Sequence, residues 1–302
     1  MQLVDGAFTG LPPLHLPSPG LPFRIILRLS ARRTLRYARQ PPELATLAGP
    51  GELLCGTMDG SNLALVSPRS RTALIAASRD MLRFPYHLRY ELIEFAVFTL
   101  AARALSLIPL HAACVGRSQR GLLLMGPSGA GKSTLSLHCC LQGMQLLSED
   151  AVFVSPDRLL AVGLPNFVHV RSESLRQLED EAMAARIRQS PIIHRRSGVA
   201  KFEVDLRQLG CRLPRVPLAI EAIIFLSTRA AGAEATLLPL SARELRAKLA
   251  ATQPYAAGLA SWQGLRGHLG SLQGFELRRG QHPSESAIAL RHLLDRRGGK
   301  VS

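Results

Sequence analysis

One eight-residue segment fits the pattern G-x-x-x-x-G-K-[ST]: Gly126, Pro127, Ser128, Gly129, Ala130, Gly131, Lys132 and Ser133. The apolar run 121–125 before it predicts a buried strand, and residues 134–141 can continue as a helix. Glycines let such a loop curl so that successive backbone N–H groups converge, and the helix N-terminus adds about half a positive charge there. The segment therefore predicts a phosphate-binding loop that joins a strand to a helix in an α/β fold.

The loop also predicts the ligand, a nucleotide with its magnesium ion. Lys132 would neutralise the β- and γ-phosphates of ATP, and the Ser133 hydroxyl would ligate Mg²⁺. Thr134 completes the predicted nucleotide-binding set, although its hydroxyl is less suited to reach the metal. The alternative is a chance match in a glycine-rich chain, which the strand and helix on either side make a weak explanation.

Charge and composition restrict the partners. The 302 residues include 47% apolar residues, enough to bury the core of one large domain or two smaller ones. The formal charge of +15 comes almost wholly from arginine, because only residues 132, 201, 248 and 300 are lysine. The arginines are scattered and not interleaved with aromatic residues, which argues against nucleic-acid binding. We interpret them as solvated surface that suits anionic substrates, or as a result of genomic base composition.

Location and metal content are predicted mainly by exclusion. The five cysteines lack C-x-x-C spacing, so neither a disulfide framework nor a zinc site is indicated. No charged segment followed by an apolar stretch opens the chain, so we expect a cytoplasmic protein. The most apolar window, 95–115, contains Arg103, Pro109 and His111, which argues against a membrane span.

The chain divides into three predicted parts: a β-rich N-terminal region over 1–85, a nucleotide-binding catalytic domain over 86–295, and a disordered tail over 296–302. In the first, extended segments are expected at 23–29, 52–55, 62–66 and 72–76. In the second, a helix is expected over 86–108, and a strand at 110–115 forms a hairpin with the strand before the loop. Strands are then expected at 144–154, 202–206, 219–226, 233–240 and 274–277, helices at 172–188, 241–250 and 284–294, and a loop at 190–201. A hairpin beside the loop strand predicts a mixed sheet.

Two consecutive carboxylates follow the predicted loop helix. Ordinary P-loop NTPases place an acid at the end of a distant apolar strand, but strand 219–226 ends in Ser227 and Thr228. Glu149 and Asp150 lie one short helix after Lys132, so a strand beside the loop strand would bring them to the metal. Neighbouring residues on a strand face opposite sides, so one carboxylate is expected to be buried and the other solvated. The simpler alternative is that neither of them has a function.

The order of these motifs gives a family resemblance. Residues 110–113 (Leu-His-Ala-Ala), the hairpin, 126–134, the helix and 146–150 (Leu-Leu-Ser-Glu-Asp) together resemble the catalytic core of the HPr serine kinase/phosphorylase family. The resemblance covers 110–155 and extends loosely to about 295. It implies a fold similar to the nucleotide-binding half of phosphoenolpyruvate carboxykinase, with His111 in the active site. It also implies that Glu149 and Asp150 divide the roles of Mg²⁺ ligand and base, with Asp150 the preferred base. A single histidine on an apolar strand is otherwise more often a core residue.

The sequence also departs from that family. Thr134 stands where the family has Glu, Glu149-Asp150 stand where it typically has two Asp, and the stretch that serves the reverse, phosphate-driven reaction is not found. The chain looks closer to the short kinase relatives found beside peptide-modification genes. In this interpretation the basic loop 194–201 is the substrate side and Lys201 neutralises the transferred phosphoryl group. The alternative is a mobile basic surface loop.

These observations predict an ATP- and Mg²⁺-dependent kinase that transfers the γ-phosphoryl group to a hydroxyl, most simply the serine of a protein or peptide. Two alternatives stay open: a small-molecule kinase, and a nucleotide-binding regulatory NTPase without a phosphorylated acceptor. A protein or peptide acceptor is the expected partner, homo-oligomerisation stays open, and neither nucleic acid nor a membrane is expected.

Overall fold

The computed structural model describes residues 2–12, 22–31, 40–230, 232, 234–254, 256 and 259–298. The chain forms two compact units: unit 1 is Met1–Thr9, Ser18–Leu107 and Ile193–Val199, and unit 2 is Gly10–Pro17, Ile108–Ile192 and Ala200–Ser302. We predicted a boundary after residue 85, but the units divide between Leu107 and Ile108. The reason is that the helix before this point packs against the N-terminal sheet, with Ala96 and Leu100 in one core with Ala64 and Ile75.

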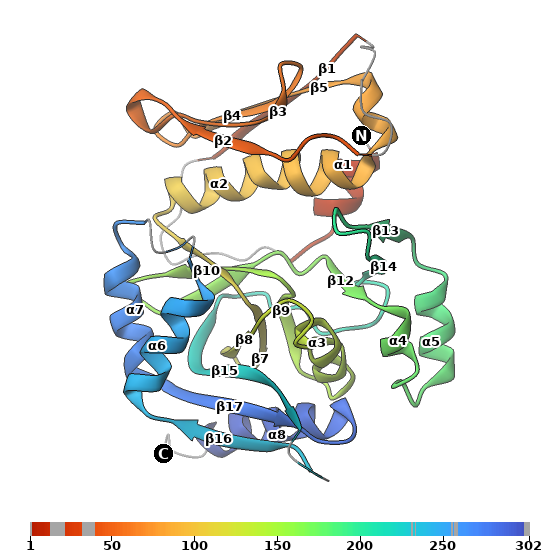
Figure 1. The fold of residues 1–302 in the computed structure, drawn as a ribbon, viewed down its shortest axis with the longest axis vertical. Helices are drawn as coiled ribbons and strands as arrows, with labels where there is room; N and C mark the ends of the chain where they lie inside the picture. Colours follow the sequence, from red (N-terminus) through yellow and green to blue (C-terminus); the bar gives the residue numbers. More distant parts are fainter. Residues whose placement is uncertain are drawn as a thin grey trace. The chain divides into compact units, whose positions relative to one another are not determined.

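Unit 1 is a five-stranded sheet covered by a helix (Figure 1). Its strand order is β1-β5-β4-β3-β2, with β1 parallel to β5 and the other pairs antiparallel. In β4 and β5 buried residues alternate with partly exposed ones, so one face of the sheet packs against the helix. The elements are α1 (Gln2–Phe8), β1 (Arg24–Ser30), β2 (Ala45–Ala48), η1 (Pro50–Glu52), β3 (Leu54–Asp59), β4 (Asn62–Ser67), β5 (Thr72–Ser78), η2 (Arg79–Arg83), the π-helix η3 (His87–Ile93) and α2 (Glu94–Ala104).

Unit 2 is built on a nine-stranded mixed sheet. Strands β8, β15 and β17 run parallel to one another, whereas β7 and β8 form the predicted antiparallel hairpin. The main strand order is β6-β10-β11-β15-β8-β7-β9, and β17 pairs with both β15 and β16. The strands are β6 (Ile108–His111), β7 (Ala113–Arg117), β8 (Arg120–Met125), β9 (Gln145–Ser148), β10 (Ala151–Ser155), β11 (Leu160–Gly163), β15 (Leu218–Ala230), β16 (Thr236–Leu240) and β17 (Gln273–Arg279).

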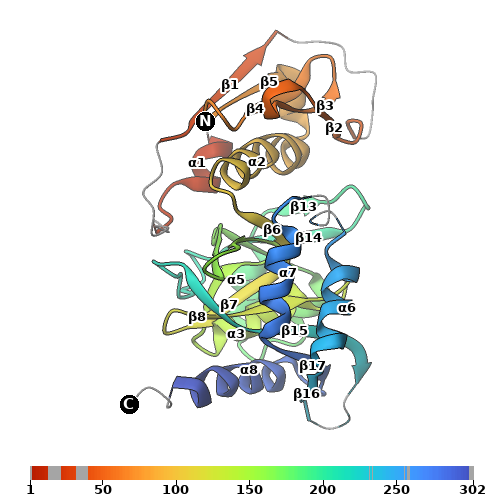
Figure 2. The same cartoon turned by 90° about the vertical axis from the view of Figure 1, so that its left-hand side faces the viewer.

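Helices cover both faces of this sheet (Figures 1 and 2). On one face α3 (Lys132–Leu141) and α8 (Pro283–Gly298) bury Leu135, Cys139 and Leu290 in one apolar core. On the other face α6 (Ala242–Thr252) and α7 (Trp262–Ser271) form a second core around Leu249 and Trp262. A three-stranded sheet of β12 (Phe167–Val170), β14 (Ala200–Asp205) and β13 (Ile192–His194) carries α4 (Ser172–Leu175) and α5 (Glu181–Arg188).

Several predicted elements are interrupted. The strand expected over 110–115 is broken at Ala112, and the one expected over 144–154 is broken at Glu149 and Asp150. The helix expected over 172–188 is two helices, the loop 190–201 contains β13, and α7 was not predicted. The expected tail is helical up to Gly298, and residues 299–302 lie outside the described residues.

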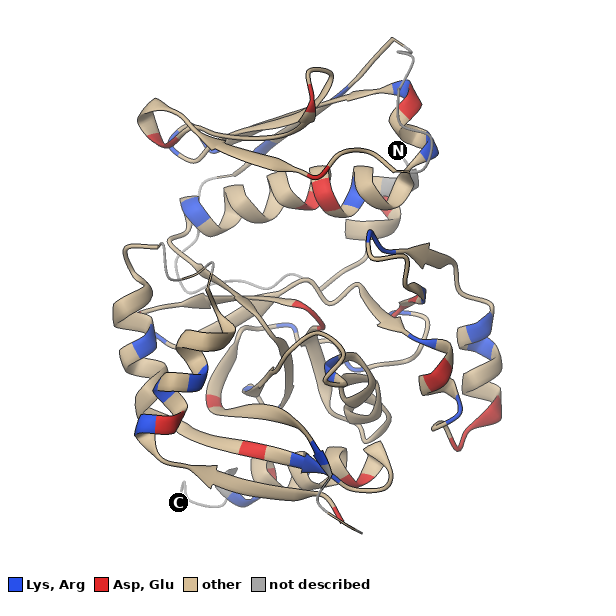
Figure 3. Ribbon diagram, in the orientation of Figure 1, with Lys and Arg blue, Asp and Glu red and all other residues tan. Residues whose placement is uncertain are grey.

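Lysine and arginine residues are spread over helices and strands of both units and do not gather on one element (Figure 3). Within the described ranges, no helix combines the length and apolar character that a membrane span requires.

Candidate functional site: the phosphate loop and its two carboxylates

The phosphate loop has a backbone that only its glycines adopt without strain. Gly126, Gly129 and Gly131 have φ values of 153°, 83° and 95°. At Gly126 a Cβ would also lie 3.3 Å from the carbonyl oxygen of Leu226, so strand β15 restricts this position further. Buried strand β8 enters the loop and α3 leaves it at Lys132. The loop therefore stands at the carboxyl end of a parallel strand, with a helix N-terminus behind it.

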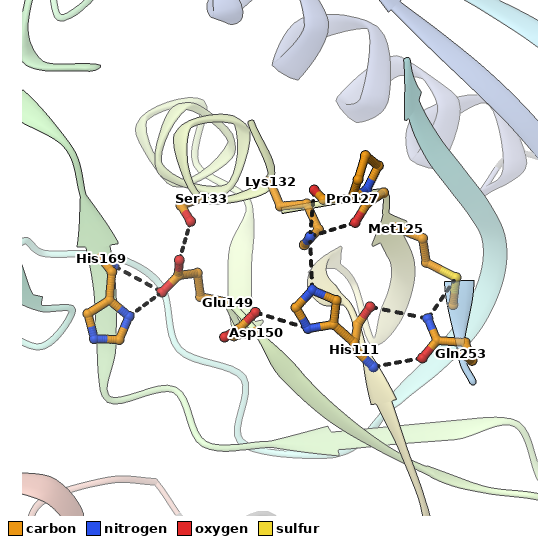
Figure 4. Close-up of polar contacts among 10 residues, drawn as sticks. His111, Met125, Pro127, Lys132, Ser133, Glu149, Asp150, His169 and Gln253 are labelled. Carbon is orange, nitrogen blue, oxygen red and sulfur yellow. Dashed lines mark hydrogen bonds and ion pairs between the residues drawn. The ribbon is translucent and has the colours of Figure 1, made fainter. Parts of the chain in front are cut away.

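Lys132 connects the loop to a histidine and an aspartate (Figure 4). Lys132 is 7% exposed, and its Nζ donates to the carbonyl oxygens of Gly126 at 2.8 Å and Pro127 at 3.4 Å. The same Nζ lies 3.2 Å from Nε2 of His111. An ammonium group only donates, so Nε2 is the acceptor and Nδ1 carries the proton. Nδ1 lies 3.2 Å from Oδ1 of Asp150, so His111 can donate to this carboxylate and orient it.

Gln253 holds the backbone of His111 in place. It follows the last residue of α6, is completely buried, and its Oε1 accepts from the His111 N–H at 2.8 Å. Its Nε2 donates to the His111 carbonyl oxygen at 3.2 Å. A single amide thus satisfies both main-chain groups of His111 where β6 ends.

Glu149 faces the other side of the site. Glu149 is 5% exposed, and the Ser133 hydroxyl donates to its Oε1. Its Oε2 accepts from the backbone N–H of His169 at 2.9 Å and lies 2.7 Å from His169 Nδ1. His169 is on β12, so the small three-stranded sheet fixes this carboxylate against the first turn of α3.

Electrostatics keep Glu149 ionised. Burial by itself would raise the pKa of its carboxyl group. The charge and hydrogen bond of His169, the charge of Lys201 and the hydrogen bond from Ser133 outweigh burial and lower the pKa from 4.5 to about 2. Glu149 is therefore a permanent buried anion beside Ser133.

Glu149 and Asp150 lie between strands β9 and β10, and this interruption explains why the two carboxylates point to different partners. Before it β9 pairs with β7, and after it β10 pairs with β6, with Ala151 opposite His111. Residues between two ladders are freed from sheet pairing, so their side chains can point toward different partners. Glu149 turns to Ser133 while Asp150 turns to His111, where its side chain is 47% exposed (Figure 4).

The remaining predicted site residues lie on β14, in the first turn of α3 and in the loop itself. Lys201, on β14, is close enough for its charge to lower the pKa of Glu149. Thr134 lies 2.9 Å, hydroxyl to hydroxyl, from Ser174 at the start of the small α4 region. The loop residues Pro127, Ser128 and Gly129 are exposed, as a loop that receives a ligand requires.

The basic loop 194–201 was expected on the substrate side, but one of its arginines has structural partners instead. Residues 193–199 belong to unit 1. There the Arg196 guanidinium binds the carboxylate of Glu91 and donates to the carbonyl oxygens of Pro41 at 2.7 Å and Pro42 at 3.1 Å. Arg196 thus already has structural partners, which argues against the proposed role of its side chain in acceptor binding.

The donor atoms at Ser133 and Glu149 suit magnesium. Both are oxygens, Glu149 is ionised, and Mg²⁺ is usually bound by one or two carboxylates together with phosphate oxygens and water. Among the described residues no group of three His, Cys, Asp or Glu side chains could by itself hold a metal ion. The two oxygens of Ser133 and Glu149 therefore fit a magnesium ion whose other ligands are phosphate oxygens and water.

Two residues of the site escaped the sequence reasoning. His169 and Gln253 lie 37 and 121 residues after Lys132, and neither stands in a motif. A histidine in the short run Phe167–Val170 carried a weak signal as a polar residue among apolar ones. Gln253 carried none, because only the packing of α6 brings it to His111.

Comparison with known proteins gives distant likenesses among solved structures. No protein-family model matches the chain, and no curated protein matches it. Among solved structures the chain is similar to the HPr(Ser) kinase/phosphatase from Coxiella burnetii, with 13% sequence identity and a TM-score of 0.30, over 63% of this chain and 99% of that one. A likeness of this size assigns neither family membership nor the role of any residue.

Proposed function

We propose that this chain is a Mg²⁺-dependent P-loop kinase that transfers the γ-phosphoryl group of ATP to a hydroxyl group. The observation that carries the proposal is the chain of contacts Lys132–His111–Asp150, in which one histidine ring links a partly exposed carboxylate to the lysine of the loop. A phosphate site needs only the loop and its lysine. A partly exposed carboxylate, linked to that lysine through a histidine, is the additional part that a transferase to a hydroxyl requires.

In the proposed reaction Asp150 is the base. The acceptor oxygen attacks the γ-phosphorus as its proton passes to the Asp150 carboxylate, and the bond from the γ-phosphorus to the bridging oxygen of ADP breaks. His111 would donate its Nδ1 proton to Oδ1 of Asp150 and so orient the carboxylate. His111 acts as a positioning residue and Asp150 as a catalytic one.

The remaining charges stabilise the phosphates. Lys132 would exchange its contacts with the Gly126 and Pro127 carbonyls for phosphate oxygens. Ser133 and Glu149 would hold Mg²⁺, which neutralises charge on the β- and γ-phosphates when bound. Lys201 lies on the same side as Glu149, where its charge would favour the phosphoryl oxygens. We place the reaction in the cytoplasm.

The acceptor class is supported by the sequence alone. The order of His111, the hairpin, the loop and Glu149-Asp150 resembles HPr serine kinases and their short relatives, so we propose a serine of a protein or peptide on a phosphoenolpyruvate carboxykinase-like core. The chemistry of Asp150 would serve a small-molecule hydroxyl equally well.

Mass spectrometry of candidate acceptors after incubation with ATP and Mg²⁺ tests the proposal. The candidates are peptides encoded by neighbouring genes, serine-containing proteins and small alcohols, with Asp150→Asn as the matched control. Wild type should yield a phosphorylated acceptor and Asp150→Asn should not. A phosphorylated small alcohol would assign the small-molecule alternative. ATP hydrolysis that Asp150→Asn leaves unchanged, with no phosphoproduct, would overturn the kinase proposal in favour of a regulatory NTPase.

A further inference from the structure

A cavity adjoins the phosphate loop at Gly131. Its volume is about 220 Å³, and its walls come from the first turn of α3, the ends of the parallel strands β15 and β17, and the start of α8. Figure 1 shows the ends of these two strands close to α8. Ligands of open α/β sheets bind outside the carboxyl ends of parallel strands. The cavity has this position, and Gly131 belongs both to its wall and to the phosphate loop.

The size and lining of the cavity restrict its ligand. Its volume is below the range of about 300–1,000 Å³ typical of whole drug-sized ligands, so it suits one part of a molecule whose remainder lies outside. Leu135, Leu226 and Pro283 offer apolar contacts, and none of the lining residues is acidic. Groups that both donate and accept hydrogen bonds are present on Thr134, Gln177, Thr228, Gln281 and Ser286.

One buried hydroxyl in the wall lacks a partner. Ser286 is 2% exposed, and its Oγ has no hydrogen-bond partner among the described residues. Buried polar groups are nearly always hydrogen-bonded, so Ser286 is the residue of the cavity wall whose hydroxyl a bound ligand would satisfy.

The walls are also fixed in place. His282 Nε2 lies 2.7 Å from the carbonyl oxygen of Gln177, and its Nδ1 lies 2.6 Å from the hydroxyl of Ser284. These contacts tie the segment before α8 to the residue that forms the opposite wall. At the mouth, Nη1 of Arg279 comes within 3.7 Å of the place where a Cβ on Gly131 would be. A cation therefore stands between the cavity and the phosphate loop.

We propose that this cavity binds the nucleoside part of the nucleoside triphosphate, with Arg279 on the phosphate nearest the sugar. The inference rests on the proposed function, because the phosphates must occupy the loop. The apolar residues contact the faces of the base and the sugar, and the hydroxyl and amide groups bind their polar edges. Thr228 is exposed at the rim and Leu226, two residues earlier on the same strand, lies deeper.

Calorimetric titration with MgATP and with magnesium tripolyphosphate separates the two parts of the site. The blocking variant is Thr228→Tyr, and Thr236→Tyr is the matched control, because it makes the same change at an exposed strand residue outside the cavity. We expect wild type to bind ATP at least about tenfold more tightly than tripolyphosphate, and Thr228→Tyr to lose about tenfold in ATP affinity. Tripolyphosphate affinity should change less than about twofold in both variants.

Each outcome has one meaning. Unchanged ATP affinity in Thr228→Tyr, while the variant still binds tripolyphosphate, would overturn the inference and leave the kinase proposal intact. If wild type binds neither ligand, the proposed function itself fails. Gln281→Tyr, at a second exposed lining residue, replaces Thr228→Tyr if that variant unfolds at a lower temperature than the control, and the same loss is expected.

Discussion

The two carboxylates give the sharpest test of the assigned roles, because conservative changes should separate them. Asp150→Asn keeps an oxygen that accepts from His111 Nδ1 but cannot take a proton from the acceptor. General-base catalysis contributes typically about 10²–10⁴-fold, so turnover should fall by about 10³-fold, or about 4 kcal/mol. The side chain is about half exposed, so the free energy of unfolding should change by less than about 1 kcal/mol.

Glu149→Gln should instead affect stability and metal use. The amide oxygen can accept from both donors of His169 while the amide NH₂ donates to the Ser133 hydroxyl, so the hydrogen bonds survive and the charge is lost. The difference between an unfolded-state pKa of 4.5 and a folded-state pKa of about 2 corresponds to about 3 kcal/mol of stabilisation. A lowered folded-state pKa gives stabilisation that is complete above pH 4.5 and lost as the pH falls toward 2. The deficit of Glu149→Gln should therefore be about 3 kcal/mol at neutral pH and shrink below pH 4.5.

Urea unfolding at several pH values and turnover against Mg²⁺ concentration measure both effects. Glu149→Gln should need more Mg²⁺ for half-maximal turnover, and saturating Mg²⁺ should restore part of its rate. Asp150→Asn should not respond to added metal. If excess Mg²⁺ rescues Asp150→Asn and not Glu149→Gln, the roles are exchanged. Turnover of Asp150→Asn within about tenfold of wild type would refute Asp150 as the base.

Three further changes test the surrounding structure. Lys132→Ala should lower turnover by about 10³-fold or more in a steady-state assay, with a small change in thermal unfolding because the lost hydrogen bonds and the relieved burial of a cation oppose each other. Gln253→Leu should lower the free energy of unfolding in urea by about 3 kcal/mol, since it removes two buried hydrogen bonds to the main chain of His111. Arg196→Ala should cost about 2 kcal/mol of stability by thermal unfolding, through the loss of its contact with Glu91. Its ATP affinity by calorimetry should stay within about twofold, whereas a large loss would place this loop at the nucleotide.

Local sequence patterns predicted the phosphate loop and its neighbours well. A glycine-rich loop between an apolar strand and a helix allows few backbone paths, so β8, the loop and α3 are where the motif places them. The hairpin of β7 and β8 and the helix expected from residue 241, which begins with a capping box of Ser241 and Glu244, were also confirmed, because each depends on residues that are close in sequence. One buried and one partly exposed carboxylate at 149 and 150 were also expected, but the structure produces this pattern by a break between two ladders and not by alternation along one strand.

Contacts between distant segments could not be predicted in this way. The breaks at Ala112 and at Glu149-Asp150 arise because neighbouring halves of each segment pair with different strands, which no local pattern encodes. His169 reaches Glu149 through the pairing of β12 with β14, and Gln253 reaches His111 through the packing of α6. The partners of Arg196 lie more than a hundred residues before it, so its structural role could not be read from the basic loop.

The fate of the γ-phosphoryl group is the most direct test of the central claim. ATP labelled in its γ-phosphate is incubated with Mg²⁺, the wild-type chain and serine-containing candidate peptides, and the label is divided between peptide and inorganic phosphate. The account predicts label on a serine hydroxyl with wild type and none with Asp150→Asn. Label that appears only as inorganic phosphate, at the same rate in both proteins, would contradict it.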